Sequence, residues 1–363
     1  MKKQIALIAV LTLTAAGFLG IAADSSDAAG FDITDGTGRT FHYDQPSEHI
    51  VVAGFAVTLT MIDLGFADKI VATDTYGGYD YYKEPKLEVI KDLPSIGSIG
   101  SAANNENIIA QLVQWVEDKT LSLDDTIVFT TYVTNGAVLR AELDKRGFEH
   151  VLMWGSISEY GKIADMVDTL SMAMSGKKST VAEDMRLAQS TVSEKTEGVA
   201  KEDAIFVWWS ASVGFKVGKS GSLAVSLIEA AGGRSLGQST GSGSTYGDQN
   251  TIIQLLESNR DALVLLDSSY VKAHGAEKFR NDVLNGDKEI KILPMEQTWN
   301  NYCPESADGL WAIAGALYPD IFGGEDRPIS NSGSDNPNVI LYSIAGIVIV
   351  AIVIGAFFVL RRP

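Results

Sequence analysis

The sequence has one cysteine, only four histidines and far fewer basic than acidic residues. Cys303 cannot form an intramolecular disulfide, and no cysteine near the N-terminus is available to carry a lipid anchor. The histidines are scattered without metal-ligand spacing on one helix face, so we expect no site for a bare transition metal. They are His42, His49, His150 and His274. The net charge of −17 repels phosphate backbones, so we expect no nucleic-acid partner.

The two ends of the chain are apolar and carry no acidic residue. Lys2 and Lys3 precede an apolar run and the small residues Ala22 and Ala23, the order typical of a secretory signal. All 46 acidic residues lie between residues 24 and 338, whereas four of the 29 Lys and Arg residues flank the apolar ends. The middle of the chain is therefore more acidic than the net charge suggests.

The C-terminal run from Val339 to Leu360 has no charged side chain and is long enough to cross a bilayer as a helix. Arg361 and Arg362 follow it, and basic flanks remain on the cytoplasmic side. Residues 323–338 are rich in Gly, Ser, Asn, Asp and Pro, which predicts a flexible stalk. We therefore expect a body at the cell surface, held in the cytoplasmic membrane by a C-terminal helix.

The body between these ends alternates short β-branched runs with helical patterns, which indicates an α/β fold. The expected strands are 49–53, 69–73, 126–131, 151–154, 204–208, 262–267 and 290–294. The expected helices include 57–64, 105–117, 137–146 and 221–231. Residues 158–200 favour helix throughout and separate two halves of similar length, so we predict two Rossmann-like lobes joined by one long helix.

These patterns divide the chain into six parts. They are a signal peptide (1–23), an N-terminal α/β lobe (31–157), a helical segment with the interlobe helix (158–200), a C-terminal α/β lobe (201–322), a stalk (323–338) and a transmembrane anchor (339–360). A ligand would then bind between the lobes, near the carboxyl ends of their strands.

Several short motifs occur in a fixed order along the body. They are Asp35-Gly36-Thr37-Gly38-Arg39, Glu48-His49-Ile50-Val51-Val52, Asn105-Glu106-Asn107, Ala231-Gly232-Gly233 and Leu317-Tyr318-Pro319-Asp320. Their order and spacing resemble the substrate-binding proteins of ABC importers for iron chelates and cobalamin. The resemblance covers residues 31–322.

This resemblance implies a protein that captures a metal chelate, such as a ferric siderophore, or cobalamin outside the cell. It implies delivery to a membrane permease driven by an ATPase, and neither enzymatic activity nor a resident cofactor. In the family, one carboxylate on each lobe pairs with the permease. Glu106 matches the N-lobe position, whereas the C-lobe position matches Ile253, with Asp248 nearby as the candidate.

Aromatic residues are dense in the loops expected at the strand ends, and large flat chelates need such surfaces. The candidate ligand contacts are Tyr76, Tyr79, Tyr132, Trp154, Trp209, Tyr270, Trp299 and Tyr302. Core or loop packing is the alternative explanation for each of these residues.

Two other functions remain open at this point. The missing C-lobe carboxylate favours a surface sensor or adhesion module with the same fold and no permease. The segment around Ser239 matches G-x-S-x-G, and Asp267 and His274 follow in hydrolase order, but it lacks the required strand-to-helix context. A helical anchor with no lipid-bearing cysteine suits an archaeal surface.

Overall fold

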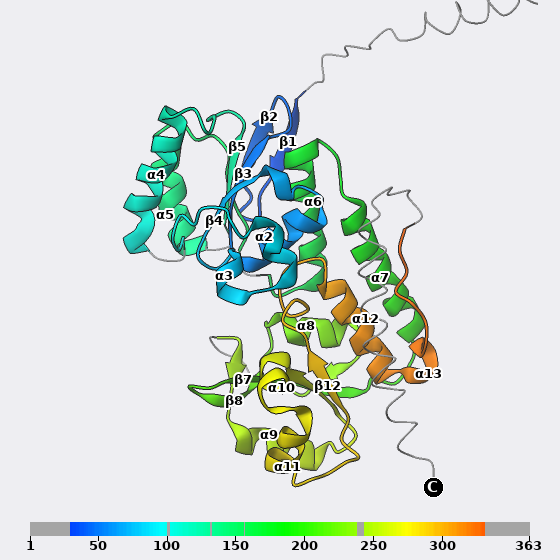
Figure 1. The fold of residues 1–363 in the computed structure, drawn as a ribbon. Helices are drawn as coiled ribbons and strands as arrows, with labels where there is room; N and C mark the ends of the chain where they lie inside the picture. Colours follow the sequence, from blue (N-terminus) through cyan, green and yellow to red (C-terminus); the bar gives the residue numbers. More distant parts are fainter. Residues whose placement is uncertain (1–29, 100–101, 131–132, 156, 238–242, 331–363) are drawn as a thin grey trace, which may run out of the picture.

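The computed structural model describes residues 30–99, 102–130, 133–155, 157–237 and 243–330 (Figure 1). The predicted signal peptide and transmembrane anchor lie outside these ranges, as does the second half of the predicted stalk, residues 331–338. Within these ranges, no helix is both long and apolar enough to cross a membrane.

The N-terminal lobe is built on a four-stranded parallel sheet in the order β4-β3-β5-β6. Its strands are β3 (His49–Ala53), β4 (Ile70–Thr73), β5 (Thr126–Thr130) and β6 (Val151–Met153). Its helices are α2 (Phe55–Asp63), α3 (Tyr79–Tyr82), α4 (Asn105–Glu117) and α5 (Val133–Asp144), with short 3-10 turns η1 (Ala67–Lys69), η2 (Pro85–Ile90) and η3 (Ala102–Asn104). The strands are almost wholly buried, which explains their continuous apolar sequences.

An antiparallel hairpin of β1 (Phe31–Thr34) and β2 (Thr40–Tyr43) precedes this sheet. The strand prediction missed the hairpin, because its alternating polar residues resemble a loop. Gly38, at φ 84, supplies the left-handed residue that its turn requires.

The C-terminal lobe has a six-stranded mixed sheet. Its order is β10-β8-β7-β11-β12, with β9 paired to β7. The strands are β7 (Asp203–Ser210), β8 (Gly214–Gly218), β9 (Arg234–Ser235), β10 (Thr245–Tyr246), β11 (Leu263–Asp267) and β12 (Ile292–Met295). The helices are α8 (Leu223–Ala230), α9 (Gln249–Ser258), α10 (Ser268–His274), α11 (Ala276–Val283), α12 (Ser306–Leu317) and α13 (Pro319–Phe322).

Two antiparallel helices, not one long helix, occupy the segment between the lobes. α6 (Tyr160–Ser175) ends at Gly176 in the left-handed conformation, and α7 (Thr180–Thr196) begins after Ser179. The Ser179 side chain accepts hydrogen bonds from the first turn of α7. The predicted helical segment therefore contains two helices, of which α7 joins the lobes, because Gly176 and Ser179 are a stop and a start signal within a continuously helical pattern. α7 runs from the upper lobe to the lower one in Figure 1.

The inner faces of both sheets share one hydrophobic core. In β3, Ile50 and Val52 belong to this core, and in β7 so do Ala204 and Phe206. The alternate residues of each strand enter separate outer cores, one for each lobe. Residues of α6, α7, α8 and α12 fill the space between the sheets. The lobes are therefore joined by continuous apolar packing as well as by the chain.

Candidate functional site

The first candidate surface is a group of aromatic rings after β4, which we call the tyrosine cluster. It consists of Tyr76, Tyr79, Tyr81 and Tyr82. The ring of Tyr81 lies 4.9 Å from that of Tyr76 and 4.7 Å from that of Tyr82, in edge-to-face contact. Tyr81 remains 54% exposed. The cluster therefore presents aromatic faces to a partner instead of burying all of them.

A buried carboxylate lies under the tyrosine cluster. The Oδ1 atom of Asp74 accepts backbone hydrogen bonds from Gly54 (2.9 Å), Tyr76 (3.1 Å) and Gly77 (2.7 Å). Its Oδ2 atom is buried and has no hydrogen-bond partner among the described residues. Burial raises the pKa of Asp74 to about 6, although the three backbone donors oppose the shift. The sequence analysis missed this residue, and its position directly after a buried strand was the available signal.

The C-terminal lobe contributes aromatic residues from the segment between β12 and α12. Trp299 and Tyr302 are partly buried and pack against the shared core, as do Tyr79 and Tyr82 of the other lobe. Burial raises the pKa of Tyr82, and both Asp74 and Tyr302 add to this shift. Tyr302 is therefore within electrostatic range of the tyrosine cluster. Of the predicted contacts, Tyr79, Trp299 and Tyr302 thus pack against the core that both lobes share, and Tyr76 contacts Tyr81 within the tyrosine cluster.

Three charged residues form an interlobe ion cluster beside these rings. Lys86 of η2 lies 2.7 Å from Asp63 of α2 and also pairs with Glu305, which precedes α12. Burial and the adjacent Glu305 raise the pKa of Asp63. Burial opposes ionisation of Glu305 as well, but Lys86 outweighs it and lowers the pKa of that carboxyl. No local sequence pattern predicts this cluster, because Lys86 and Glu305 are distant in the chain.

Trp209 and Tyr270 lie together in the C-terminal lobe, with their rings 5.4 Å apart. His274 contacts both rings. Tyr270 is only 3% exposed and belongs to the outer core of this lobe, whereas Trp209 is partly buried against that core. In this conformation Trp209, but not Tyr270, has ring surface available to a ligand.

Trp154 follows β6 and packs on the β1–β2 turn. A Cβ atom added to Gly36 would lie 2.8 Å from the Trp154 ring, so glycine permits the contact. Trp154 thus lies beside the turn and packs against the shared core. Tyr132, the remaining predicted contact, lies outside the described residues, as does Ser239 of the G-x-S-x-G match.

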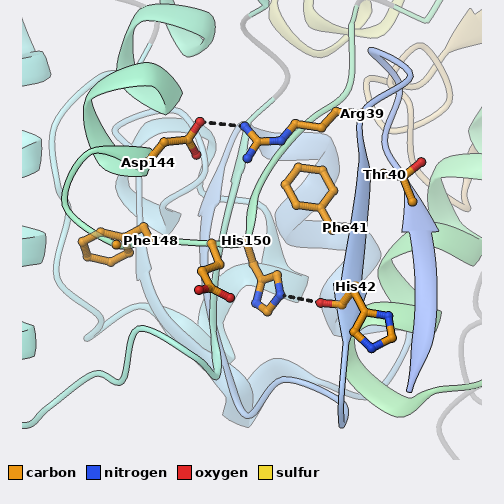
Figure 2. A pocket seen from close by; sticks show the side chains of 9 residues that line it. Arg39, Thr40, Phe41, His42, Asp144, Phe148 and His150 are labelled. Atoms are coloured by element: carbon orange, nitrogen blue, oxygen red, sulfur yellow. Dashed lines mark hydrogen bonds and ion pairs between the residues drawn. The ribbon is translucent and has the colours of Figure 1, made fainter. Parts of the chain in front are cut away.

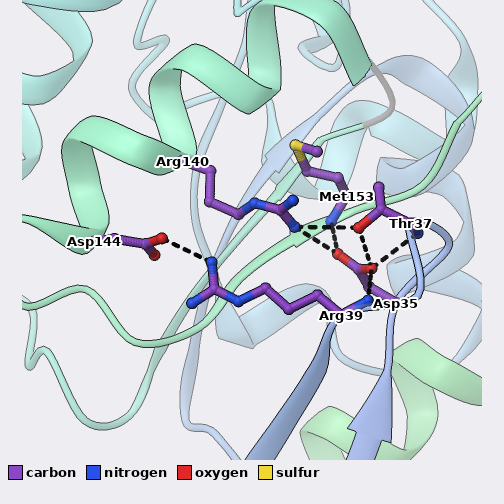
Figure 3. A network of polar contacts seen from close by, with 6 residues as sticks. All are labelled: Asp35, Thr37, Arg39, Arg140, Asp144 and Met153. Carbon is purple, nitrogen blue, oxygen red and sulfur yellow. Dashed lines mark hydrogen bonds and ion pairs between the residues drawn. The ribbon is translucent and has the colours of Figure 1, made fainter.

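The same turn explains the Asp35-Gly36-Thr37-Gly38-Arg39 motif (Figure 3). Asp35 Oδ1 accepts hydrogen bonds from the backbone and hydroxyl of Thr37 and from the Arg39 backbone. Its Oδ2 accepts from Arg140 of α5 and from the Met153 backbone of β6, each at 3.0 Å. The motif is therefore a structural clamp between the hairpin and the sheet.

Two surface hollows lie away from the interlobe boundary. The hollow in Figure 2 has a volume of about 430 Å³ and lies between β2 and the start of β6. Arg39 pairs with Asp144 above it, and His150 hydrogen-bonds to the His42 carbonyl. A second hollow, of about 510 Å³, is lined by residues 119–125 with His49 and Val116. Neither hollow is lined by a predicted ligand contact.

The predicted docking residues are both exposed. Glu106 lies in the first turn of α4, where its negative charge interacts favourably with the positive end of the helix dipole. Asp248 caps α9, and a hydrogen bond from the Thr251 backbone holds its pKa below the usual range. Ile253, at the position where the resemblance predicted a carboxylate, is partly buried against the outer core. The described residues contain no cluster of three His, Cys, Asp or Glu arranged to hold a metal.

Comparison with solved structures identifies the architecture. The chain aligns with the periplasmic heme-binding protein RhuT of a Roseiflexus species at a TM-score of 0.54 and 16% identity, covering 75% of this chain and 98% of that one. It aligns with the vitamin B12-binding protein BtuF of Vibrio cholerae at a TM-score of 0.54 and 14% identity, covering 77% of this chain and 99% of that one. The fold is that of a two-lobed periplasmic binding protein.

A third periplasmic-binding-protein-like structure agrees with this result. The Fe3+-hydroxamate transport protein of Saccharomonospora viridis has a TM-score of 0.52 and 20% identity, covering 81% of this chain and 99% of that one. No family model and no curated protein matches the sequence. The predicted two-lobe α/β fold is confirmed. These three proteins are binding proteins or part of a transport system and not enzymes, in agreement with the expectation of a non-catalytic protein.

Proposed function

We propose that this protein is the solute-binding component of an ABC import system. It captures a metal chelate or cobalamin between its lobes and delivers it to a permease and its ATPase. The observation that carries the proposal is a periplasmic-binding-protein-like fold in which the tyrosine cluster of one lobe lies within electrostatic range of Tyr302 of the other. Solved proteins with this fold are a heme-binding protein, a vitamin B12-binding protein and part of an Fe3+-hydroxamate transport system.

A ligand screen with the full chain in mild detergent tests this proposal. A bound chelate or corrinoid should quench tryptophan fluorescence, because Trp299 lies in the segment proposed to contact it, and should raise the melting temperature. Trp299→Phe should reduce the quenching, and Trp115→Phe on α4 is the matched control. If no ferric chelate or corrinoid changes either signal, the importer function is wrong and the sensor or adhesion alternative is favoured.

We also propose that the body lies outside the cell, exported by the N-terminal signal and held by the C-terminal apolar run. The positions of the basic flanks support this topology. A chain ending at residue 338 should appear in the medium or periplasm, whereas the full chain should sediment with membranes. Membrane retention of the shortened chain would contradict the anchor.

A further inference from the structure

The interlobe boundary also restricts the charge of the ligand. Resting on the proposed function, we infer that this protein takes an uncharged or cationic chelate and rejects polyanionic ones. Three iron-containing ligands differ in their charge. A ferric ion held by three hydroxamates is neutral, the same ion held by three catecholates carries three negative charges, and heme carries two carboxylates.

The tyrosine cluster lies in a segment with more acidic than basic residues. Asp74, Asp80 and Glu84 are acidic within residues 74–84, and Lys83 is the basic residue there. Asp80 and Lys83 are exposed, whereas Asp74 is buried. Aromatic faces attract cations, whereas the neutral tyrosine hydroxyls can donate a hydrogen bond to an anion but cannot balance its charge. This part of the boundary therefore favours a neutral or positive group.

The buried carboxylate of Asp74 adds a second, independent observation. Three backbone N–H groups bind its Oδ1 atom, while its Oδ2 atom is buried and lacks a partner among the described residues. Above pH 6 the carboxyl is mostly ionised. Its field acts through protein instead of water, so it is weakly screened by salt. A polyanion on the tyrosine cluster would be repelled by this charge.

Most of the described arginines, the usual partners of carboxylates and other planar anions, form ion pairs elsewhere, and Arg260 lies in the link between α9 and β11. The described ion pairs of arginine are Arg39–Asp144, Arg140–Asp35, Arg146–Glu142, Arg186–Asp165, Arg186–Asp168, Arg234–Asp203, Arg280–Glu277 and Arg327–Asp308. None of these pairs includes a residue of the tyrosine cluster or of the segment 296–302.

Lysine does not supply the missing positive charge either. Lys86 of the interlobe ion cluster pairs with Asp63 and Glu305, and Lys272 lies 3.0 Å from Glu296, so carboxylates compensate both charges. Lys219 is 3% exposed and already engaged. The described residues 95–99, 102–104, 133–135, 209–213, 236–237 and 243–247 include no charged residue. In the part of the chain that the structure describes, Lys83 is outnumbered by Asp80 and Glu84, so these segments do not form the cationic lining that a triscatecholate or a dicarboxylate requires.

Competitive binding to the full chain in mild detergent tests the inference. The probes are a neutral ferric trihydroxamate, the same complex with an ammonium tail, a ferric triscatecholate and heme. We expect the first two to bind at least about 100-fold more tightly than the triscatecholate. Added salt should weaken the ammonium complex more than the neutral one.

A charge reversal provides the matched pair of variants. Asp80→Lys, at an exposed position within the tyrosine cluster, should raise triscatecholate affinity by about three- to tenfold and lower that of the ammonium complex. Glu117→Lys, at an exposed position at the far end of α4, should change neither the triscatecholate affinity nor the affinity for the ammonium complex. Tighter binding of triscatecholate or heme than of the neutral complex would overturn the charge inference and leave the importer function standing. If neither these four probes nor cobalamin binds, both the charge inference and the importer function are overturned.

Discussion

Two buried aspartates show how differently one residue type is used in this protein. Both oxygens of Asp35 accept hydrogen bonds, and Arg140 neutralises its charge. Only one oxygen of Asp74 has partners among the described residues, and no ion pair of Asp74 is present there. Asp35 therefore stabilises the fold, whereas Asp74 costs stability when it ionises. Such a cost is typical of residues retained for function.

Replacing Asp35 tests its role as a clamp. Asp35→Ala should lower the free energy of unfolding by about 3 kcal/mol, because the buried Met153 backbone N–H and Arg140 both lose their partner. Asp44→Ala is the control, since its side chain is 97% exposed and should change stability by less than about 0.5 kcal/mol. Denaturant unfolding measures both. Equal effects of the two substitutions would contradict the clamp.

Replacing Asp74 tests the cost of its charge. The pKa of Asp74 is raised in the folded state, so the neutral carboxyl is the form that the fold favours. Its contribution to stability is therefore complete below the unfolded pKa and is lost as the pH rises to about 6 and the carboxyl ionises. Asp74→Asn should therefore gain stability relative to the natural chain between about pH 4 and pH 6, by up to about 3 kcal/mol, and no further above. Denaturant unfolding across this range measures the difference. A difference independent of pH would show that the carboxyl is not perturbed.

At the scale of elements, the junction between the lobes combines helices with a buried ion cluster. α6 and α7 pack against each other, and α7 also packs against α12 of the C-terminal lobe. Lys86, Asp63 and Glu305 join η2, α2 and the start of α12 across the same boundary. Asp63 and Glu305 share the single charge of Lys86 there. The net charge of the cluster therefore depends on whether Asp63, whose pKa is raised, carries a proton. The shared core predicts small lobe movements, because wide opening would expose apolar surface.

Substitutions in the ion cluster separate the contribution of the lysine from that of the second carboxylate. Lys86→Ala should destabilise the protein by about 3–5 kcal/mol, because two buried carboxylates lose their counter-charge. Glu305→Gln should cost less than about 1 kcal/mol, since it leaves one lysine with one carboxylate. Lys162→Ala is the control, as its pair with Glu159 is mostly exposed. Thermal unfolding in detergent ranks the three. A larger loss for Glu305→Gln than for Lys86→Ala would contradict the assignment.

At the scale of the whole molecule, the proposed function requires a contact with a permease as well as a ligand. Glu106 and Asp248 are exposed acids in the first turn and at the cap of helices on different lobes. Asp248 also holds the start of α9, so its replacement would disturb the helix. Glu106 makes no side-chain hydrogen bond that defines the fold among the described residues. It is therefore the cleaner test of docking.

Glu106→Arg should reduce uptake of the ligand in the native host at least about tenfold, because it reverses the charge offered to the permease. Ligand affinity of the purified chain should not change, and the melting temperature should fall only slightly, because a cation at a helix N-terminus costs about 0.3–1 kcal/mol. Glu117→Arg, at the other end of α4, is the control. Unchanged uptake would contradict docking through Glu106 and favour a sensor or adhesion module.

The sequence alone determined the α/β class, the two halves and most of the buried strands. β3 and α4 begin and end where the sequence predicted, because continuous β-branched runs and a regular helical period are local signals. The aromatic density after the strands was also visible locally. The hairpin of β1 and β2 and the break at Gly176 were missed, since their signals are short and lie within patterns of the opposite kind.

Only the tertiary structure decided which of these residues share a surface. It placed Tyr270 of α10 in an outer core and Tyr302, which follows β12, against the shared core. It also joined Lys86 to Glu305 and left one oxygen of Asp74 without a described partner. The physical reason is that burial and charge pairing depend on which faces of the two sheets meet. That choice is made by packing between residues far apart in the chain, which no local pattern records.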